Sequence, residues 1–237
     1  MIGDQVGAPG SLCENAHGSV RTLSHEEARR VYDRIGARQD TQAFYEDVAT
    51  GAVIRLGEFA SAESVFEFGC GTGRFAHTLL RDHLGPSASY RAVDQSPRMA
   101  GLTTRRLADF GDRIQVVLTD GRPPTSEGSA CFDRFVSNYV FDLLSEDDIA
   151  AVISEAHRIL RPGGLLCLSS LSPGHGSLSR AVIGVWSFLH RLNPKLVAGC
   201  RPIELPGFLD EASWQLRHHQ TLQPFGLPSE VIVAERR

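Results

Sequence analysis

Three glycines at alternate positions, Gly69, Gly71 and Gly73, directly follow an apolar segment at 64–68. A helix-like stretch over 74–84 comes next. A buried strand that turns tightly into the start of a helix forms a binding edge, because backbone N–H groups face the ligand there. Glycine suits this turn, since a side chain would obstruct both the turn and the approach of a ligand to the backbone. The spacing therefore predicts a binding loop for a small molecule.

Polar residues close the strand candidates that follow. Asp94 closes the second strand, Asp120 and Gly121 close the third, and Asn138 and Tyr139 close the fourth. A carboxylate after the second strand can accept both hydroxyls of a ribose, and one after the third can contact an adenine amino group. Any one of these residues could be a helix cap or a surface charge. An ordered set of them at one sheet edge favours a binding site.

The elements that must position these residues alternate between strand and helix. Strands are predicted over 64–68, 89–93, 114–118, 132–137, 164–170, 215–222 and 230–235, and helices over 74–84, 97–110 and 146–160. This alternation predicts an α/β fold with three layers, a doubly wound, seven-stranded and mostly parallel sheet. The segment 223–228 is too short for a crossover, so the last strand is expected to be antiparallel.

The chain divides into three predicted parts. Residues 1–22 are rich in small and polar residues and are expected to be a flexible N-terminus. Residues 23–62 are expected to form a helical cap, with helices over 24–34 and 41–59. Residues 63–237 form the binding domain, with a helical insertion at about 173–209.

The insertion contains a stretch at 177–190 with an apolar face made by Leu178, Val182, Val185, Trp186 and Leu189, and a second short helix is expected over 194–199. One interpretation is a helix that simply packs on the sheet. The other is a lid over an apolar substrate, because the insertion emerges at the strand ends where α/β proteins bind ligands.

The glycine spacing argues against a dinucleotide. The dinucleotide fingerprint needs a third glycine at the position of Arg74, and the acidic Glu67 precedes the first glycine. A nucleotide-binding oxidoreductase is therefore disfavoured.

At this point the sequence resembles the Rossmann-like, class I S-adenosylmethionine (SAM)-dependent methyltransferases, similar to those of quinone biosynthesis and other small-molecule methyltransferases. The resemblance is carried by residues 65–73, 92–99, 119–121, 136–139 and 160–164. It covers roughly residues 32–237. Residues 31–40 are polar and aromatic, and two interpretations fit them. They could be a solvated connector, or a cap that closes over SAM as in such enzymes.

The resemblance implies which residues hold the cofactor. The glycines would meet the methionine moiety and the ribose, Asp94 the ribose hydroxyls, Met99 the adenine ring, and Asn138 the sulfonium end. Glu67 would order the loop or meet the ammonium through water. The full set of implied SAM-binding residues is Tyr32, Glu67, Gly69, Gly71, Gly73, Asp94, Gln95, Met99, Asp120, Gly121 and Asn138, and the residues expected to cover the substrate are Tyr45, Tyr139 and Trp186.

Methyl transfer from a sulfonium is an in-line displacement that depends mainly on proximity and alignment. A base is needed only if the acceptor arrives protonated. His175 and His190 are the candidates for such a base, although a surface or packing role is favoured for each of them, and Tyr139 is a candidate substrate contact.

Composition narrows the partners. The net charge of −4 gives no case for nucleic acid or an anionic membrane. The five cysteines are scattered without a CxxC pair, so no metal site is expected. No secretory signal or transmembrane run is recognised, which predicts a cytoplasmic protein. The sequence thus predicts SAM-dependent methyl transfer to a small organic, apolar or lipid-like acceptor. A non-catalytic SAM-binding partner protein and, less favoured, the oxidoreductase are the alternatives.

Overall fold

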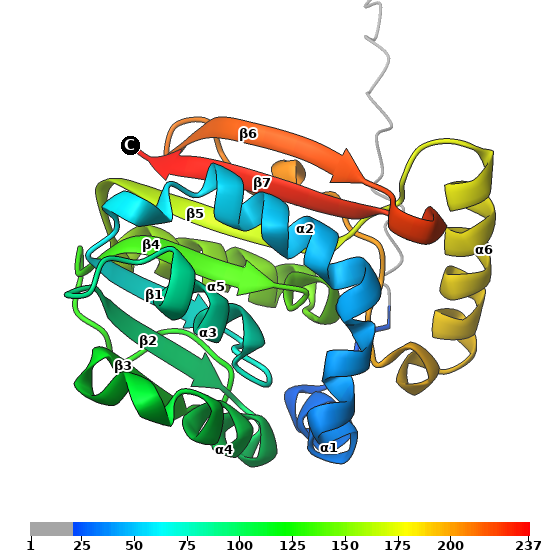
Figure 1. Ribbon diagram of the computed structural model, residues 1–237. Coiled ribbons are helices and arrows are strands. Elements are labelled where there is room, and N and C mark those ends of the chain that lie inside the picture. Colours follow the sequence, from blue (N-terminus) through cyan, green and yellow to red (C-terminus); the bar gives the residue numbers. More distant parts are fainter. Residues whose placement is uncertain (1–20) are drawn as a thin grey trace, which may run out of the picture.

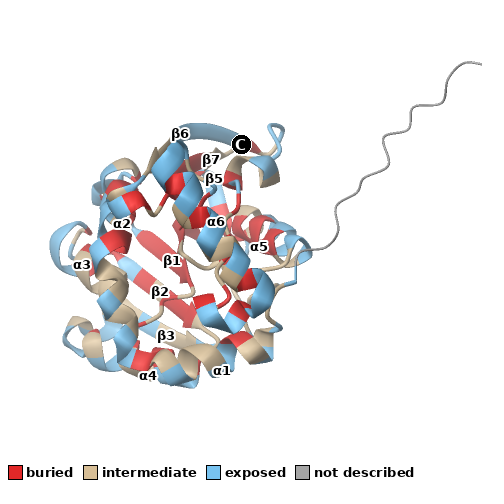
Figure 2. Cartoon of the chain, turned by 90° about the vertical axis from the view of Figure 1, so that its right-hand side faces the viewer, coloured by how far each residue is buried: buried red, intermediate tan, exposed pale blue. Residues whose placement is uncertain are grey.

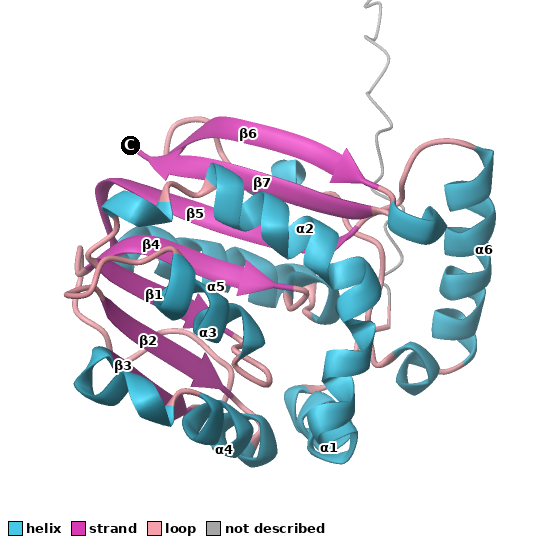
Figure 3. Ribbon diagram, in the orientation of Figure 1, coloured by secondary structure: helices cyan, strands magenta, loops and turns pink. Residues whose placement is uncertain are grey.

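A computed structural model describes residues 21–237, and the expected flexible segment falls almost wholly outside this range. Seven strands form one sheet in the order β3-β2-β1-β4-β5-β7-β6 (Figure 3). Their bounds are β1 Ser64–Phe68, β2 Ser89–Asp94, β3 Ile114–Leu118, β4 Phe132–Asn138, β5 Leu160–Leu171, β6 Trp214–Leu222 and β7 Ser229–Arg236. Strand β7 is antiparallel to both its neighbours, whereas the pairs among β1 to β5 are parallel. The predicted fold class is confirmed.

Strand β1 lies in the middle of the parallel part of the sheet and is buried along its whole length. Its side chains alternate between two cores, because successive residues of a strand point to opposite faces. Val65 belongs to the core on one face, and Phe66 and Phe68 to the core on the other. The carboxyl end of this central strand is where the glycine loop begins.

Helices cover both faces (Figure 1). Helices α2 and α3 lie over one face and α5 lies over the other, while α1 and α6 stand beyond the carboxyl ends of the parallel strands. The helix bounds are α1 His25–Ile35, α2 Ala43–Leu56, α3 Arg74–Asp82, α4 Pro97–Arg106, α5 Glu146–Ile159 and α6 Ser177–Leu192. Within residues 21–237, no helix combines the length and the apolar character that a membrane crossing requires.

Local sequence explains where the helices start. Ser24 and Glu27 form a reciprocal capping box at α1, in which each side chain accepts a hydrogen bond from the other residue's backbone N–H. The Ser96 side chain caps α4, which has Pro97 at its first position, and the Ser145 side chain caps α5.

Three predicted helices are shorter in the structure. The helix expected over 41–59 is α2, which begins at Ala43 directly after the 3-10 helix η1 (Gly36–Gln42). It ends at Leu56, because Gly57 caps it and the next residue has a left-handed backbone. The helix expected over 97–110 ends at Arg106 and continues as the 3-10 helix η3 (Ala108–Arg113). Helix α3 ends at Asp82.

Helix α6 packs on a face that matches the predicted one only in part (Figure 2). Val182, Trp186 and Leu189 of the predicted face are half-buried. The buried residues of α6 are Ser179, Ile183 and His190, whereas Leu178 and Val185 of the predicted apolar face are exposed. Polar anchors explain the rotation, because the Ser179 hydroxyl donates to the Gln223 side chain over 2.7 Å. The second helix expected over 194–199 is the short 3-10 helix η5 (Pro194–Val197).

Candidate cofactor and acceptor site

The three glycines of the loop after β1 have separate physical roles. All have positive φ, at 77° for Gly69, 54° for Gly71 and 76° for Gly73, a region that disfavours side chains. A Cβ on Gly69 would lie 2.4 Å from Val140, and one on Gly73 would lie 2.9 Å from Thr103. A Cβ on Gly71 would meet nothing within 4 Å. Gly69 and Gly73 therefore permit close packing, while Gly71 turns its bare backbone toward open space.

That open space is a cleft of about 380 Å³ at the carboxyl edge of the sheet. The cleft is within the size range of small-molecule sites. Of the residues predicted to bind the cofactor or the substrate, it is lined by Tyr32, Glu67, Gly69, Gly71, Asp94, Gln95, Gly121, Asn138 and Tyr139. The strand ends identified in the sequence thus meet at one place.

Asp94 is fixed in the cleft by two backbone donors. Its carboxylate accepts from the N–H of Gly71 over 2.9 Å and from the N–H of Ser96 over 2.8 Å. Burial raises the pKa of Asp94 to about 6, against the opposing effect of these hydrogen bonds. A carboxylate has about four acceptor sites, so it can still receive two hydroxyls.

Glu67 on β1 also lines the cleft and is almost fully buried. It is 2% exposed and accepts a hydrogen bond from the Tyr90 hydroxyl over 3.0 Å. Burial raises the pKa of Glu67 to about 8, because no cation compensates the cost of removing its charge from water. This side chain is poised to carry a proton near neutral pH.

Asn138 at the end of β4 offers an unused donor. Its side-chain oxygen accepts from the Ser169 hydroxyl over 2.8 Å, which leaves the amide nitrogen directed elsewhere. This nitrogen is buried and has no hydrogen-bond partner among residues 21–237, although Asn138 lines the cleft. A buried donor without a partner is costly and therefore points to a ligand.

Three predicted cofactor residues do not line the cleft in this structure. Met99 is 1% exposed inside α4, and Gly73 packs on that helix. Asp120 is exposed, and its carboxylate accepts from the N–H of Arg122 over 3.0 Å. The neighbouring Gly121 does line the cleft, beside the Gln95 side chain.

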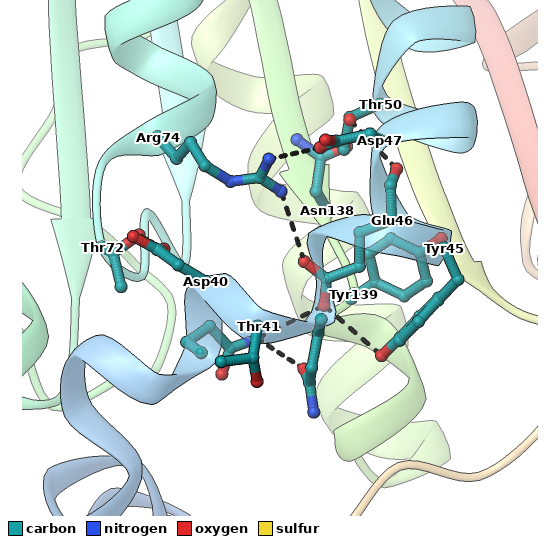
Figure 4. Close-up of polar contacts among 12 residues, drawn as sticks. Asp40, Thr41, Tyr45, Glu46, Asp47, Thr50, Thr72, Arg74, Asn138 and Tyr139 are labelled. Carbon is teal, nitrogen blue, oxygen red and sulfur yellow. Dashed lines mark hydrogen bonds and ion pairs between the residues drawn. The ribbon is translucent and has the colours of Figure 1, made fainter.

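The N-terminal cap is tied to the glycine loop by charged contacts that the sequence did not predict (Figure 4). Arg74, at the start of α3, forms an ion pair with Asp47 and approaches Glu46 to 3.8 Å. Asp40 accepts from the Thr72 hydroxyl and from the Arg106 guanidinium, each over 2.6 Å. The cap helix α2 therefore closes one side of the cleft. The only sequence feature that could have indicated this contact is Arg74, the residue at the position where the dinucleotide motif has a glycine.

A second, smaller cavity of about 10 Å³ adjoins the cleft, and Tyr32, Glu46 and Tyr139 line both spaces. We call it the inner cavity. The predicted covering residues Tyr45, Tyr139 and Trp186 all line it. The Tyr45 and Tyr139 rings meet edge to face at 5.8 Å.

The inner cavity also contains Asp142, which is fully buried and was not considered from the sequence. The two predicted histidines line neither space. His175 is exposed in the loop before α6, and His190 is buried within α6. Burial lowers the pKa of His190.

Comparison with known proteins agrees with this geometry. Residues 65–164 match the family described as a methyltransferase domain. A malonyl-[acyl-carrier protein] O-methyltransferase from Serratia marcescens is 26% identical over 157 residues, which are 65% of this chain and 56% of that protein. A demethylmenaquinone methyltransferase from Tropheryma whipplei is 28% identical over 151 residues, 62% of this chain and 59% of that protein. The chain thus spans less than two thirds of the length of these relatives.

Among solved structures, the N-methyltransferase NodS from Bradyrhizobium japonicum, in complex with S-adenosylhomocysteine, superposes with a TM-score of 0.66. It is 18% identical and the match covers 88% of this chain and 98% of that one, so this likeness concerns the fold. The domain match, the relatives and the fold together confirm the predicted class. Residues 65–164 match a methyltransferase domain within a Rossmann-like fold, and SAM is the cofactor of class I methyltransferases.

Proposed function

We propose that this protein transfers a methyl group from SAM to a small organic acceptor with an apolar or lipid-like body. The observation that carries the proposal is the cleft at the carboxyl edge of the sheet, where Gly71 presents bare backbone and Asp94 presents a fixed carboxylate. The relatives support the acceptor class, since one is named for malonyl-[acyl-carrier protein] and another for demethylmenaquinone.

The residues of the cleft fit the cofactor. The backbone at Gly71 would lie against it without steric hindrance, Asp94 would accept the ribose hydroxyls, and the free amide nitrogen of Asn138 would donate to it. Glu67 would meet the ammonium of the methionine part, directly or through water. When bound, SAM supplies an electrophilic methyl group on a sulfonium.

The protein's own contribution is placement. Holding two reactants in line can lower a barrier by roughly 7–11 kcal/mol without any acid or base. The cap, closed on the glycine loop through Arg74 and Asp40, would exclude water from the cleft. The covering residues Tyr45, Tyr139 and Trp186 would then hold the acceptor on the far side of the methyl group.

Calorimetry with SAM tests the first half of the proposal. We expect saturable binding to the wild-type protein and at least about tenfold weaker binding to Gly71→Ala, because the new methyl group enters the cleft and the positive φ becomes strained. Gly85→Ala is the matched control, since Gly85 also has free space around it but lies between α3 and β2, at the opposite edge of the sheet. No heat with SAM would refute the proposal.

An acceptor screen that measures the release of S-adenosylhomocysteine tests the second half. Release that depends on an added acceptor would establish catalysis. SAM binding without turnover on any quinone-like, phenolic, amine or acyl acceptor would favour a non-catalytic SAM-binding protein instead.

A further inference from the structure

The inner cavity is built differently from an ordinary packing defect. It has room for about one water-sized group. Side chains from separate parts of the chain converge on it, with Tyr32 from α1, Glu46 from α2, Asp142 from the 3-10 helix η4 (Phe141–Leu143) and Trp186 from α6. It adjoins the cofactor cleft, because Tyr32, Glu46 and Tyr139 line both spaces. A single polar head group of a larger molecule could occupy it.

Asp142 gives this space its chemical character. The residue is 0% exposed, and neither carboxylate oxygen receives a hydrogen bond of good geometry from the described residues, although the Leu171 backbone, the Cys200 thiol and the Arg201 guanidinium lie near enough to favour its charged form. A buried carboxyl group without a partner is costly, so native structures normally pair it. The Arg201 guanidinium favours the charged carboxylate from nearby but makes its own hydrogen bond to the Leu144 carbonyl, over 2.8 Å. Asp142 lines the inner cavity, which shares Tyr32, Glu46 and Tyr139 with the cleft.

Glu46 stands at the junction of the two spaces and is weakly held. The Tyr45 hydroxyl and the Gln39 amide donate to it only at 3.4 Å, and Arg74 is 3.8 Å away on the side of the cleft. The residue is 9% exposed. Burial raises the pKa of Glu46 and that of Asp142 to about 7, so both carboxyls can exchange protons near neutral pH.

Four aromatic rings form part of the remaining walls, beside Gln39, Gln42, Leu171, Cys200 and Leu227. Tyr32, Tyr45, Tyr139 and Trp186 surround the two carboxyls. Aromatic faces attract cations and, together with carboxylates, form a site for an ammonium group. The same charges would repel an anionic acceptor such as a free carboxylate. The chemistry of the cavity therefore selects for a positively charged head group.

We propose that the inner cavity receives the protonated amine of the methyl acceptor, with Asp142 as its ion-pair partner and Glu46 as the group that takes its proton. This inference rests on the proposed function, because it names the acceptor of that same site. An ammonium has no free electron pair and cannot attack a methyl group. Transfer of one proton from the ammonium nitrogen to the Glu46 carboxylate leaves a neutral amine with its lone pair and a neutral carboxylic acid.

Binding of simple probes to the protein saturated with S-adenosylhomocysteine tests the charge preference. The probes are benzylamine, benzyl alcohol, phenol and benzoate, followed by calorimetry and thermal shift. We expect benzylamine to bind at least about tenfold more tightly than benzyl alcohol, and benzoate not to bind, because only the ammonium gains a charge-assisted contact with Asp142.

Proton release provides a readout that a merely structural role of Asp142 would not produce. Burial raises the pKa of Tyr32, Tyr45, Tyr139 and Cys200, so these groups stay neutral. Burial lowers the pKa of Arg201, but a guanidinium keeps its charge in proteins, which leaves Asp142 and Glu46 to titrate. An ammonium that pairs with these carboxyls at about pH 7 should expel part of a proton. Calorimetry in two buffers of different ionisation enthalpy measures it.

Two variants complete the test. Asp142→Asn should abolish the preference for benzylamine over benzyl alcohol, and Glu46→Gln should reduce proton release and methylation of amines. SAM binding by calorimetry checks that each variant is folded. Equal or tighter binding of benzyl alcohol, phenol or benzoate, or no binding of benzylamine, would overturn the inference. Methylation of phenols or acids but not of amines would also overturn the inference while leaving the proposed function intact. If the wild-type protein did not bind SAM, the proposed function itself would be refuted.

Discussion

The cofactor cleft and the inner cavity lie side by side, yet different structural elements line them. The cleft of about 380 Å³ is formed by strand ends and the backbone of the glycine loop on one side and by the cap elements α1, η1 and α2 on the other. The inner cavity of about 10 Å³ is formed by side chains from α1, α2, η4 and α6. The sheet fixes the first directly. The second depends on how inserted helices pack against it.

This difference has consequences for adaptability. Backbone at the end of a central strand cannot move without breaking ladder hydrogen bonds, so the cleft should be pre-formed. Side chains on surface helices can rearrange at lower cost, and the inner cavity must widen to admit more than one head group. Changes in the cleft should therefore affect stability and SAM binding, and changes around the cavity should affect the acceptor alone.

The largest effect is expected from the buried carboxyl of the cleft. The pKa of Glu67 is about 8 in the folded protein and near 4.5 when unfolded, so the folded state holds the proton more tightly. Between these values the stability falls as pH rises, on the order of several kcal/mol by about pH 8. Glu67→Gln removes this cost and keeps an acceptor for Tyr90.

Chemical denaturation between about pH 5 and pH 8 measures this pH dependence of the free energy of unfolding. The variant should lose part of the wild-type slope and gain relative stability as pH rises. Glu63→Gln, whose side chain is 81% exposed just before the start of β1, serves as the control and should leave the slope unchanged. A parallel pH dependence for Glu67→Gln and the wild type would show that Glu67 is not protonated in the folded protein.

A smaller effect is expected from the two acidic strand ends. Asp94→Ala should weaken SAM binding by about tenfold or more, because a carboxylate held in the cleft by two backbone donors is lost. Asp120→Ala should weaken it less, since Asp120 is exposed and does not line the cleft. Calorimetric SAM affinities of both variants decide this. Equal losses would mean that Asp120 moves to the ligand when it binds.

The sequence predicted the cleft well because its determinants are local. Glycine spacing and polar strand ends are read from single segments, and parallel strands bring them to one edge. Asp142 and Glu46 lacked such a signal, since each is an ordinary acidic residue until tertiary packing buries it. The predicted packing face of α6 was only partly right for a related reason. Its apolar residues surround much of the helix, and the Ser179 contact to Gln223, distant in sequence, selected the packed face.

A substitution can change the inner cavity without changing the cleft. Trp186 forms part of the cavity wall and is anchored by a hydrogen bond from its indole N–H to the Cys200 carbonyl, over 2.9 Å. Trp186→Ala should raise the KM for the acceptor several-fold while SAM affinity changes by less than about twofold, because Trp186 does not line the cleft. Phe188→Ala, 60% exposed on the same helix, is the control. An equal loss of SAM binding would indicate that Trp186 only packs the fold.

The smallest effect concerns α6 itself and separates helix stability from site chemistry. Gly184 is an exposed position in the middle of α6, and a Cβ there would meet nothing within 4 Å. Gly184→Ala should stabilise the protein by about 0.8–1 kcal/mol through helix propensity alone, which corresponds to about 2–4 °C in Tm. SAM affinity should not change, because α6 contributes no residue to the cleft lining. If SAM binding weakened as α6 became more stable, the helix and the cleft would be coupled, and the division between a backbone-built and a side-chain-built site would fail.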